Sequence, residues 1–213
     1  MKKTSIFLLA AVATLTFQAC QKDDPVPETD QEEVGTATLI FTEVHREAHG
    51  DHFHYHDEEG GQVETVEFTT VNGQLVPQEG HVHLSKGKTY RLDLQSTDFL
   101  GRRSEQTFVT RDDIHQVFFA TTPASEISKF RYEYGDENAA GQNLQVGVTG
   151  YLTVLETSNT FVMRYVMRHL NPGVKANITA ADWNNPNFLN FAGATDLDLR
   201  FEMHFVDGAG HGH

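Results

Sequence analysis

Histidine is concentrated in one stretch of this chain, residues 45–83. Seven of the twelve histidines fall there, namely His45, His49, His52, His54, His56, His81 and His83. Three acids, Asp57, Glu58 and Glu59, directly follow the first five. Neutral imidazole is the commonest protein ligand of borderline metals, and carboxylates complete such sites. These residue types predict a transition-metal site that Asp57 or Glu58 could complete as an oxygen ligand. Zinc is the first choice of ion, with copper and nickel as alternatives.

The spacing of the histidines indicates how they could share one ion. His52, His54 and His56 recur at every second position, so an extended segment would present all three on one face. His81 and His83 form a second pair with the same spacing. Two such segments side by side would offer three or four imidazoles to one metal. We therefore expect a site that takes ligands from both segments.

Other local forms and roles are open for this stretch. His45, His49 and His52 also fit a helical or turn spacing, although Gly50 and the pair at 60–61 argue against a long helix. A solvated histidine-rich loop that binds metal only adventitiously is one alternative. A loop that gains charge between about pH 5 and 7 is another.

Two further histidines lie in predicted strands. His115 opens an aromatic strand, and His169 closes another on the same face as Met163, Tyr165 and Met167. The ordinary interpretation is a buried histidine with a hydrogen-bond partner. The alternative is that His115 and His169 form a second or shared metal site.

The N-terminal residues form a targeting signal. Lys2 and Lys3 precede a mostly apolar run from Ile6 to Phe17, which ends at Cys20. Residues 1–19 resemble a bacterial lipoprotein signal peptide, which implies cleavage before Cys20 and lipid on that cysteine. Cys20 is the single cysteine of the chain. An intramolecular disulfide, a thiolate zinc site and a cysteine nucleophile are therefore excluded.

Residues 20–35 are polar and acidic and contain prolines, as expected of a flexible tether. The segment from Gln21 to Asp24 resembles the export signal of surface lipoproteins in the Bacteroidota, which implies a location on the outer membrane facing outside. Removal of Lys2 and Lys3 with the signal peptide takes the formal charge from −14 to −16. This charge argues against nucleic acid as a partner and favours attraction of cations.

The rest of the chain shows short segments with the alternation of β-strands. We expect about eight strands, at Thr36–Val44, Val63–Val71, Thr89–Gln95, His115–Thr121, Ile127–Tyr134, Val146–Leu155, Phe161–Leu170 and Asp196–Phe205. The pair Asn72-Gly73 is a strong hairpin turn signal after the second strand. In the last strand, alternation predicts odd-numbered residues inward and Asp196, Asp198, Arg200, Glu202 and His204 outward.

These strands predict an all-β fold, a single antiparallel β-sandwich of the immunoglobulin-like or a related type. The domain spans residues 36–206 and carries a histidine-rich insert at 45–61. Its length of about 170 residues is enough to bury a core of its own. Residues 207–213 read as a flexible tail.

Four short motifs carry a resemblance to a known group of proteins. They are DDIHQVFF at 112–119, YEYGDEN at 132–138, RHLNP at 168–172 and DLDLRF at 196–201. Over roughly residues 88–206 the chain resembles Bacteroidota surface lipoproteins made of a single β-sandwich domain. The resemblance implies association with TonB-dependent outer-membrane receptors. The histidine-dense stretch lies outside these motifs.

We conclude that the sequence favours a lipid-anchored surface protein that captures zinc, or a similar divalent metal, for uptake through an outer-membrane transporter. We expect no catalytic residues, since Gly-x-Ser-x-Gly and His-Glu-x-x-His are absent from the chain. A non-catalytic adhesion or interaction module is the main alternative. A metal-dependent hydrolase is a third, and it requires a ligand position open to water.

The lipid anchor can be tested at its single attachment point. Cys20→Ser removes the acceptor thiol, so we expect the variant to leave the membrane fraction or to stay unprocessed. Cell fractionation and the mass of the mature chain measure this. Unchanged processing and membrane association would contradict the assignment.

Overall fold

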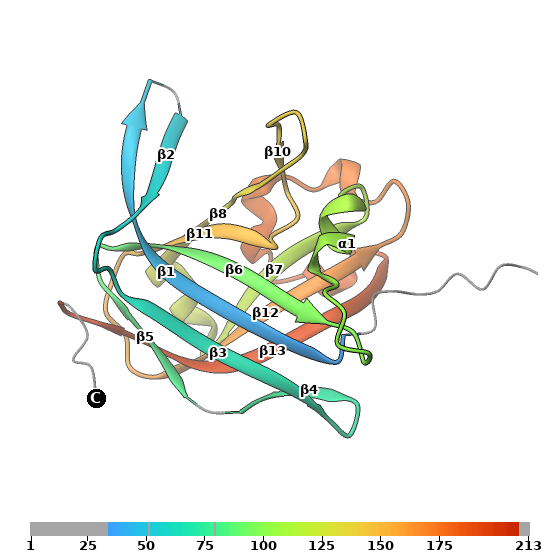
Figure 1. Ribbon diagram of the computed structural model, residues 1–213, viewed down its shortest axis with the longest axis horizontal. Coiled ribbons are helices and arrows are strands. Elements are labelled where there is room, and N and C mark those ends of the chain that lie inside the picture. Colours follow the sequence, from blue (N-terminus) through green and yellow to red (C-terminus); the bar gives the residue numbers. More distant parts are fainter. Residues whose placement is uncertain (1–33, 51, 79, 209–213) are drawn as a thin grey trace, which may run out of the picture.

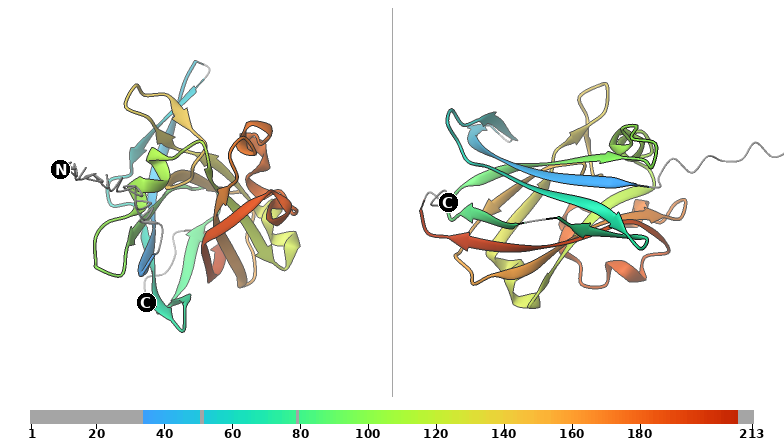
Figure 2. Two further views of the ribbon diagram at one scale, coloured as in Figure 1. Left: turned by 90° about the vertical axis from the view of Figure 1, so that its right-hand side faces the viewer. Right: turned by 60° about the horizontal axis from the view of Figure 1, so that its bottom comes forward.

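The computed structural model describes residues 34–50, 52–78 and 80–208, so the predicted signal peptide, Cys20 and most of the tether lie outside the described residues. Two β-sheets pack face to face (Figures 1 and 2). Figure 2 shows β1 and β3 in one layer and β12 and β13 in the other. This arrangement confirms the expected all-β sandwich.

The larger sheet, sheet A, has seven strands. Its path is β4 (Gln74–Pro77), β3 (Val63–Val71), β1 (Thr36–His49), β6 (Thr89–Thr97), β11 (Thr149–Val154) and β8 (Phe130–Tyr134), with β2 (His52–Asp57) paired to β1. Sheet B has four strands, in the order β5 (His81–Ser85), β13 (Gly193–Val206), β12 (Phe161–Leu170) and β7 (His115–Thr122). A small ribbon joins β9 (Asp136–Glu137) to β10 (Asn143–Leu144).

Short helices connect the strands. One α-helix, α1 (Glu105–Thr110), precedes β7, and the 3-10 helices are η1 (Ala124–Lys129), η2 (Lys175–Asn177), η3 (Ala180–Asn184) and η4 (Phe188–Asn190). The strand expected to begin at Ile127 therefore begins at Phe130, because residues 124–129 form η1. No helix in the described ranges is long and apolar enough to cross a membrane.

The sequence pattern missed the strands that carry little apolar alternation. β2 and β5 are rich in histidine, and β4 ends in Pro77, so their apolar signal is weak. β5 also pairs in parallel with β13, whereas an antiparallel sandwich was expected throughout. Two strands, β3 and β12, were predicted correctly at both ends. The Asn72-Gly73 turn was also correct, with φ values of 52° and 77°.

The core lies between the two sheets. Phe201 of β13 packs against Phe41 of β1 and Phe68 of β3, with ring centroids 6.1 and 6.0 Å apart. Tyr90 and Tyr165 are fully buried, one from each sheet. Burying a large apolar side chain contributes about 1.5–3 kcal/mol. This packing holds sheet B, and with it the ends of β7, β12 and β13, in a defined position.

Asp136, the first residue of β9, is buried and structural. Its carboxylate accepts the backbone N–H groups of Gly147 and Thr149, which fastens the chain leading into β11. Burial raises the pKa of Asp136 from 3.8 to about 6, although these hydrogen bonds oppose the shift.

Because the pKa of Asp136 is raised, we predict that the difference in stability between the wild type and Asp136→Asn depends on pH. The folded state binds the Asp136 proton more tightly than the unfolded state does. The stability that this proton contributes is complete below about pH 4 and is lost as the pH rises through about 6. Relative to the variant, the wild type should lose about 2.5 kcal/mol of unfolding free energy between pH 4 and 7. Urea unfolding at several pH values measures this. Parallel pH profiles for the two proteins would contradict it.

Candidate metal centre

Three adjacent strands of sheet B bring His115, His169 and Asp196 together. His115 is the first residue of β7 and lies directly opposite His169 of β12 in the strand register. Asp196 comes from β13, on the other side of β12. One potential ligand atom from each residue lies within 4.8 Å of the other two. In the described part of the chain, this is the one group of three or more such residues that meets that distance.

A β-bulge explains why Asp196 reaches the two imidazoles. Leu197 is paired with Met167, and Thr195 is paired with Arg168, so Asp196 is an extra residue in β13. A bulge redirects a side chain that regular alternation would send to the other face. The expectation that Asp196 points outward was therefore wrong. Its Oδ2 atom lies 3.2 Å from Nε2 of His115 and 3.6 Å from Nδ1 of His169.

His115 is fully buried, and its orientation is set by the backbone. Its Nδ1 lies 3.0 Å from the carbonyl oxygen of Arg111. A carbonyl can only accept, so this hydrogen bond requires a proton on Nδ1. In the neutral ring, the Nε2 lone pair then faces Asp196. A histidine that ligates a metal commonly donates its other N–H to a carbonyl in this way.

Arg168 and Gly193 position the Asp196 side of the centre. The Arg168 guanidinium donates to the hydroxyl of Thr195 at 2.7 Å and to the carbonyls of Phe191 and Gly193 at 2.8 and 3.1 Å. Burial lowers the pKa of Arg168, and Asp196 opposes the shift. Gly193 has a φ of +148°, and a Cβ there would lie 2.1 Å from the His169 carbonyl oxygen. Only glycine allows β13 to approach β12 this closely.

The donor set of the centre suits a divalent metal ion. Two imidazole nitrogens and one carboxylate oxygen are ligands that zinc and iron(II) both use. Three protein ligands leave at least one coordination position for water or another ligand. The group could hold a metal ion. The alternative to a metal is a proton between His115 and Asp196, which would turn the two residues into an ordinary buried ion pair.

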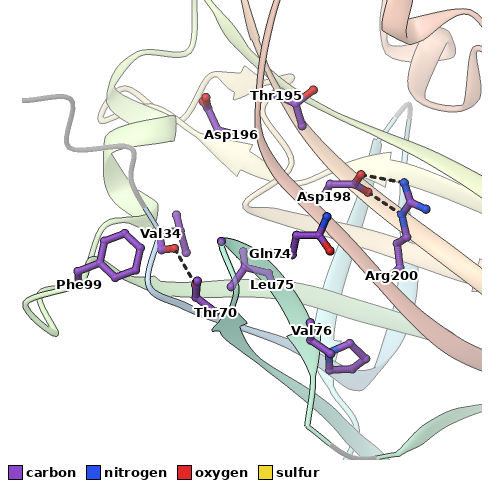
Figure 3. Close-up of a pocket in the computed structure, with 12 residues that line it drawn as sticks. Val34, Thr70, Gln74, Leu75, Val76, Phe99, Thr195, Asp196, Asp198 and Arg200 are labelled. Carbon is purple, nitrogen blue, oxygen red and sulfur yellow. Dashed lines mark hydrogen bonds and ion pairs between the residues drawn. The ribbon is translucent and has the colours of Figure 1, made fainter.

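A groove opens beside Asp196, between sheet A and β13 (Figure 3). Its volume is about 620 Å³. Val34, Leu75 and Phe99 supply apolar surface, while Asp196, Asp198 and Arg200 supply polar groups. Asp198 and Arg200 pair with each other at 3.0 Å, as the dashed lines in Figure 3 show. The side chain of Asp196 is 10% exposed, and that of His169 is 27% exposed. The centre is therefore reachable from outside while His115 stays buried.

The predicted histidine-rich insert forms a hairpin that projects from the body of the molecule (Figure 1). β1 runs on past the sandwich to His49 and pairs with β2, which places His45 opposite His56 and His49 opposite His52. Glu47 lies opposite His54. Paired residues share a face. Alternation therefore places positions 45, 47 and 49 of β1 on the same face as 54 and 56 of β2.

Contacts on this hairpin face are loose and exposed. Carboxylate oxygens of Glu47 lie 3.7 Å from Nε2 of His49 and 3.9 Å from Nε2 of His56. The rings of His49 and His54 are 4.8 Å apart, and those of His54 and His56 are 6.4 Å apart. The side chains of His49 and His56 are more than half exposed. Asp57, expected as a metal ligand, pairs instead with Arg91.

The two histidine segments that were expected to share an ion belong to different sheets. His81 and His83 lie on β5 of sheet B, whereas the hairpin histidines lie on β1 and β2, which belong to sheet A. The rings of His81 and His83 are 6.2 Å apart, and His83 lies 5.6 Å from His204 of β13. Among the described side chains, ligand atoms from the two segments do not come together, because only the buried centre has three ligand atoms within 4.8 Å of one another. A shared site therefore stays a prediction.

Comparisons with known proteins give no relative for this chain. No protein-family model, no curated protein and no solved structure matches it. The resemblance to Bacteroidota surface lipoproteins therefore stays a prediction from the sequence motifs. The centre itself must be interpreted from its own chemistry.

The opposite face of the hairpin is anchored on sheet A. The ring of Tyr55 stacks on Tyr151 of β11 at 3.6 Å, and its hydroxyl donates to Glu133 of β8 at 2.8 Å. Arg46 also contacts Glu133, at 3.3 Å. Burial raises the pKa of Tyr55 to about 12, and the hydrogen bond with Glu133 adds to the shift.

We predict that Tyr55→Ala loosens the hairpin while the sandwich stays folded. The change removes an aromatic pair worth about 0.5–1.5 kcal/mol beyond its area burial. Hydrogen exchange should become faster at residues 45–57 and stay unchanged in β12. Tyr55→Phe keeps the stacked ring and loses only the hydroxyl contact, so it should give an intermediate rate. Equal rates in all three proteins would show that this contact does not hold the hairpin.

Proposed function

We propose that this protein is a lipid-anchored metal-binding protein whose specific site is the centre formed by His115, His169 and Asp196. One observation carries the proposal. His115 Nε2, aimed by the Arg111 carbonyl, converges with the other two residues so that one donor atom from each lies within 4.8 Å of the rest. Three electron-pair donors at such separations favour a cation between them.

Zinc is the ion that we propose for the centre. Imidazole and carboxylate are zinc ligands, and a structural zinc site normally has four protein ligands. This centre offers three, and Asp196 lines an open groove. The arrangement suits an ion that is bound and then passed on. Copper and nickel also accept imidazole, and they remain the alternatives.

The hairpin would increase the capture of metal at low concentration. Among the described side chains of the hairpin, the exposed histidines gather no compact ligand set, so each ion would be held weakly and exchanged rapidly. The mature charge of −16 favours accumulation of cations near the surface. We therefore assign collection of ions to the hairpin and specific binding to the buried centre.

Location and delivery form the second part of the proposal, and sequence features support them. The signal peptide, Cys20 and the acidic tether suit a lipid anchor in the outer membrane, and the residues from Gln21 to Asp24 suit exposure on the cell surface. The motif resemblance supplies a TonB-dependent receptor as the recipient of the metal. An adhesion module with adventitious metal binding is the competing function, and it requires no specific centre.

Metal titration of the mature chain tests the centre. Asp196→Asn and His169→Ala each remove one of the three ligands, and loss of an outer-shell partner alone costs about 10–100-fold in metal affinity. We expect each variant to lose about 100-fold or more in affinity for the tightest zinc site. Isothermal calorimetry with zinc, copper and nickel measures the change and ranks the metals.

Asp198→Asn is the matched control. It removes the same charge from the same strand, but Asp198 pairs with Arg164 and Arg200 and lies outside the centre. This control should retain wild-type affinity. Zinc at about 100 times its Kd should also stabilise the wild type by about 2.7 kcal/mol against unfolding. If Asp196→Asn and His169→Ala bind zinc as tightly as the wild type, the centre is not a metal site.

A further inference from the structure

The parallel pairing of β5 with β13 builds a second group of donors, because it joins the predicted pair His81 and His83 to partners that the sequence pattern did not reveal. The register places His81 beside Glu202 and His83 beside His204. Residues two positions apart in a strand share a face. Four side chains therefore form a two-by-two arrangement, which we call the strand-edge array.

The array lies on the outer face of sheet B. The alternate residues Val82, Leu84, Met203 and Phe205 are buried in the core, so the array must face away from it. The side chains of His81 and Glu202 are 52% and 51% exposed. They are also in contact, with His81 Nε2 lying 2.6 Å from Glu202 Oε2.

We infer that His81, His83, Glu202 and His204 form a second binding site for a divalent transition metal. A His-x-His segment on one strand and a Glu-x-His segment beside it offer three imidazoles and one carboxylate. Four protein ligands of these types complete a tetrahedral zinc site. The chain would therefore hold one metal in an open centre and another in a closed surface site.

The ring separations are slightly larger than those of a pair bound to one zinc. Two imidazoles bound to one tetrahedral zinc, each with a Zn–N bond of about 2.0–2.1 Å, have ring centres about 5 Å apart. The observed centres are 6.2 Å apart for His81 and His83 and 5.6 Å apart for His83 and His204. Because His81 and Glu202 are exposed, rotation of side chains can close the remaining gap without moving the strands.

Binding here would fasten an edge strand. β5 has five residues and pairs with β13 along one side. Short edge strands open readily, and a ligand that binds only the closed form suppresses that opening. A metal held by both strands would therefore protect the β5 amides from hydrogen exchange.

The array is separate from the buried centre. Asp196 precedes Glu202 by six residues in β13, which corresponds to about 20 Å along the strand at about 3.3 Å per residue. The inference does not depend on the proposed centre, and the two can fail independently.

Hydrogen exchange with zinc on the mature chain tests the array. In the wild type, zinc at about 100 times the Kd of the array should slow exchange at residues 81–85 by up to about 100-fold. The double variant His83→Ala/His204→Ala should lose this protection and bind one zinc fewer by calorimetry. Glu202→Gln keeps the shape of its side chain and should weaken the protection.

Two controls separate the array from the other histidines. His49→Ala/His54→Ala removes the same number of imidazoles from the hairpin and should keep the zinc-dependent protection of β5. Asp196→Asn should also keep it, whether or not the centre binds metal. If zinc fails to protect β5 in the wild type, or protects it equally in His83→Ala/His204→Ala, the array is not a metal site.

Discussion

The register of β12 with its two neighbours is the constraint on which the candidate centre depends. Pairing with β7 sets His169 opposite His115, and pairing with β13 through a bulge adds Asp196. A shift of one residue in either pairing would move a donor to the other face of the sheet. The register is in turn held by the sandwich core, in which Met163, Tyr165 and Met167 of β12 are fully buried. Core packing and site geometry are thus set by the same strand.

The molecule presents donors in three different settings. The centre at the end of β12 is largely buried and oriented by the Arg111 carbonyl and by Arg168. The strand-edge array lies on a sheet surface with its spacing set by the backbone. The hairpin face is exposed and loosely arranged. Preorganised donors lose less freedom on binding, so affinity should decrease in that order. Such a gradient suits a protein that collects ions widely and retains few.

Electrostatics supports the same picture. A strongly negative chain attracts cations over the whole surface. Several of its carboxylates are nevertheless committed to structural partners. Asp198 pairs with Arg164 and Arg200, and Asp136 binds backbone N–H groups. Asp196 differs because it is largely buried and still lies 3.2 and 3.6 Å from nitrogens of two imidazoles, which favours it as a metal ligand.

The sequence by itself determined the fold class, because alternating apolar residues and turn residues are local signals. It located β3, β12 and the Asn72-Gly73 turn, and it singled out His115 and His169 as a possible metal pair. The tertiary structure alone decided which further residues join the histidines of the centre and those of β5. Asp196 enters the centre through a bulge, which alternation cannot foresee. His204 and Glu202 meet β5 through a parallel pairing between segments more than 100 residues apart. Such contacts depend on how distant strands pack, and no local pattern of residues encodes that choice.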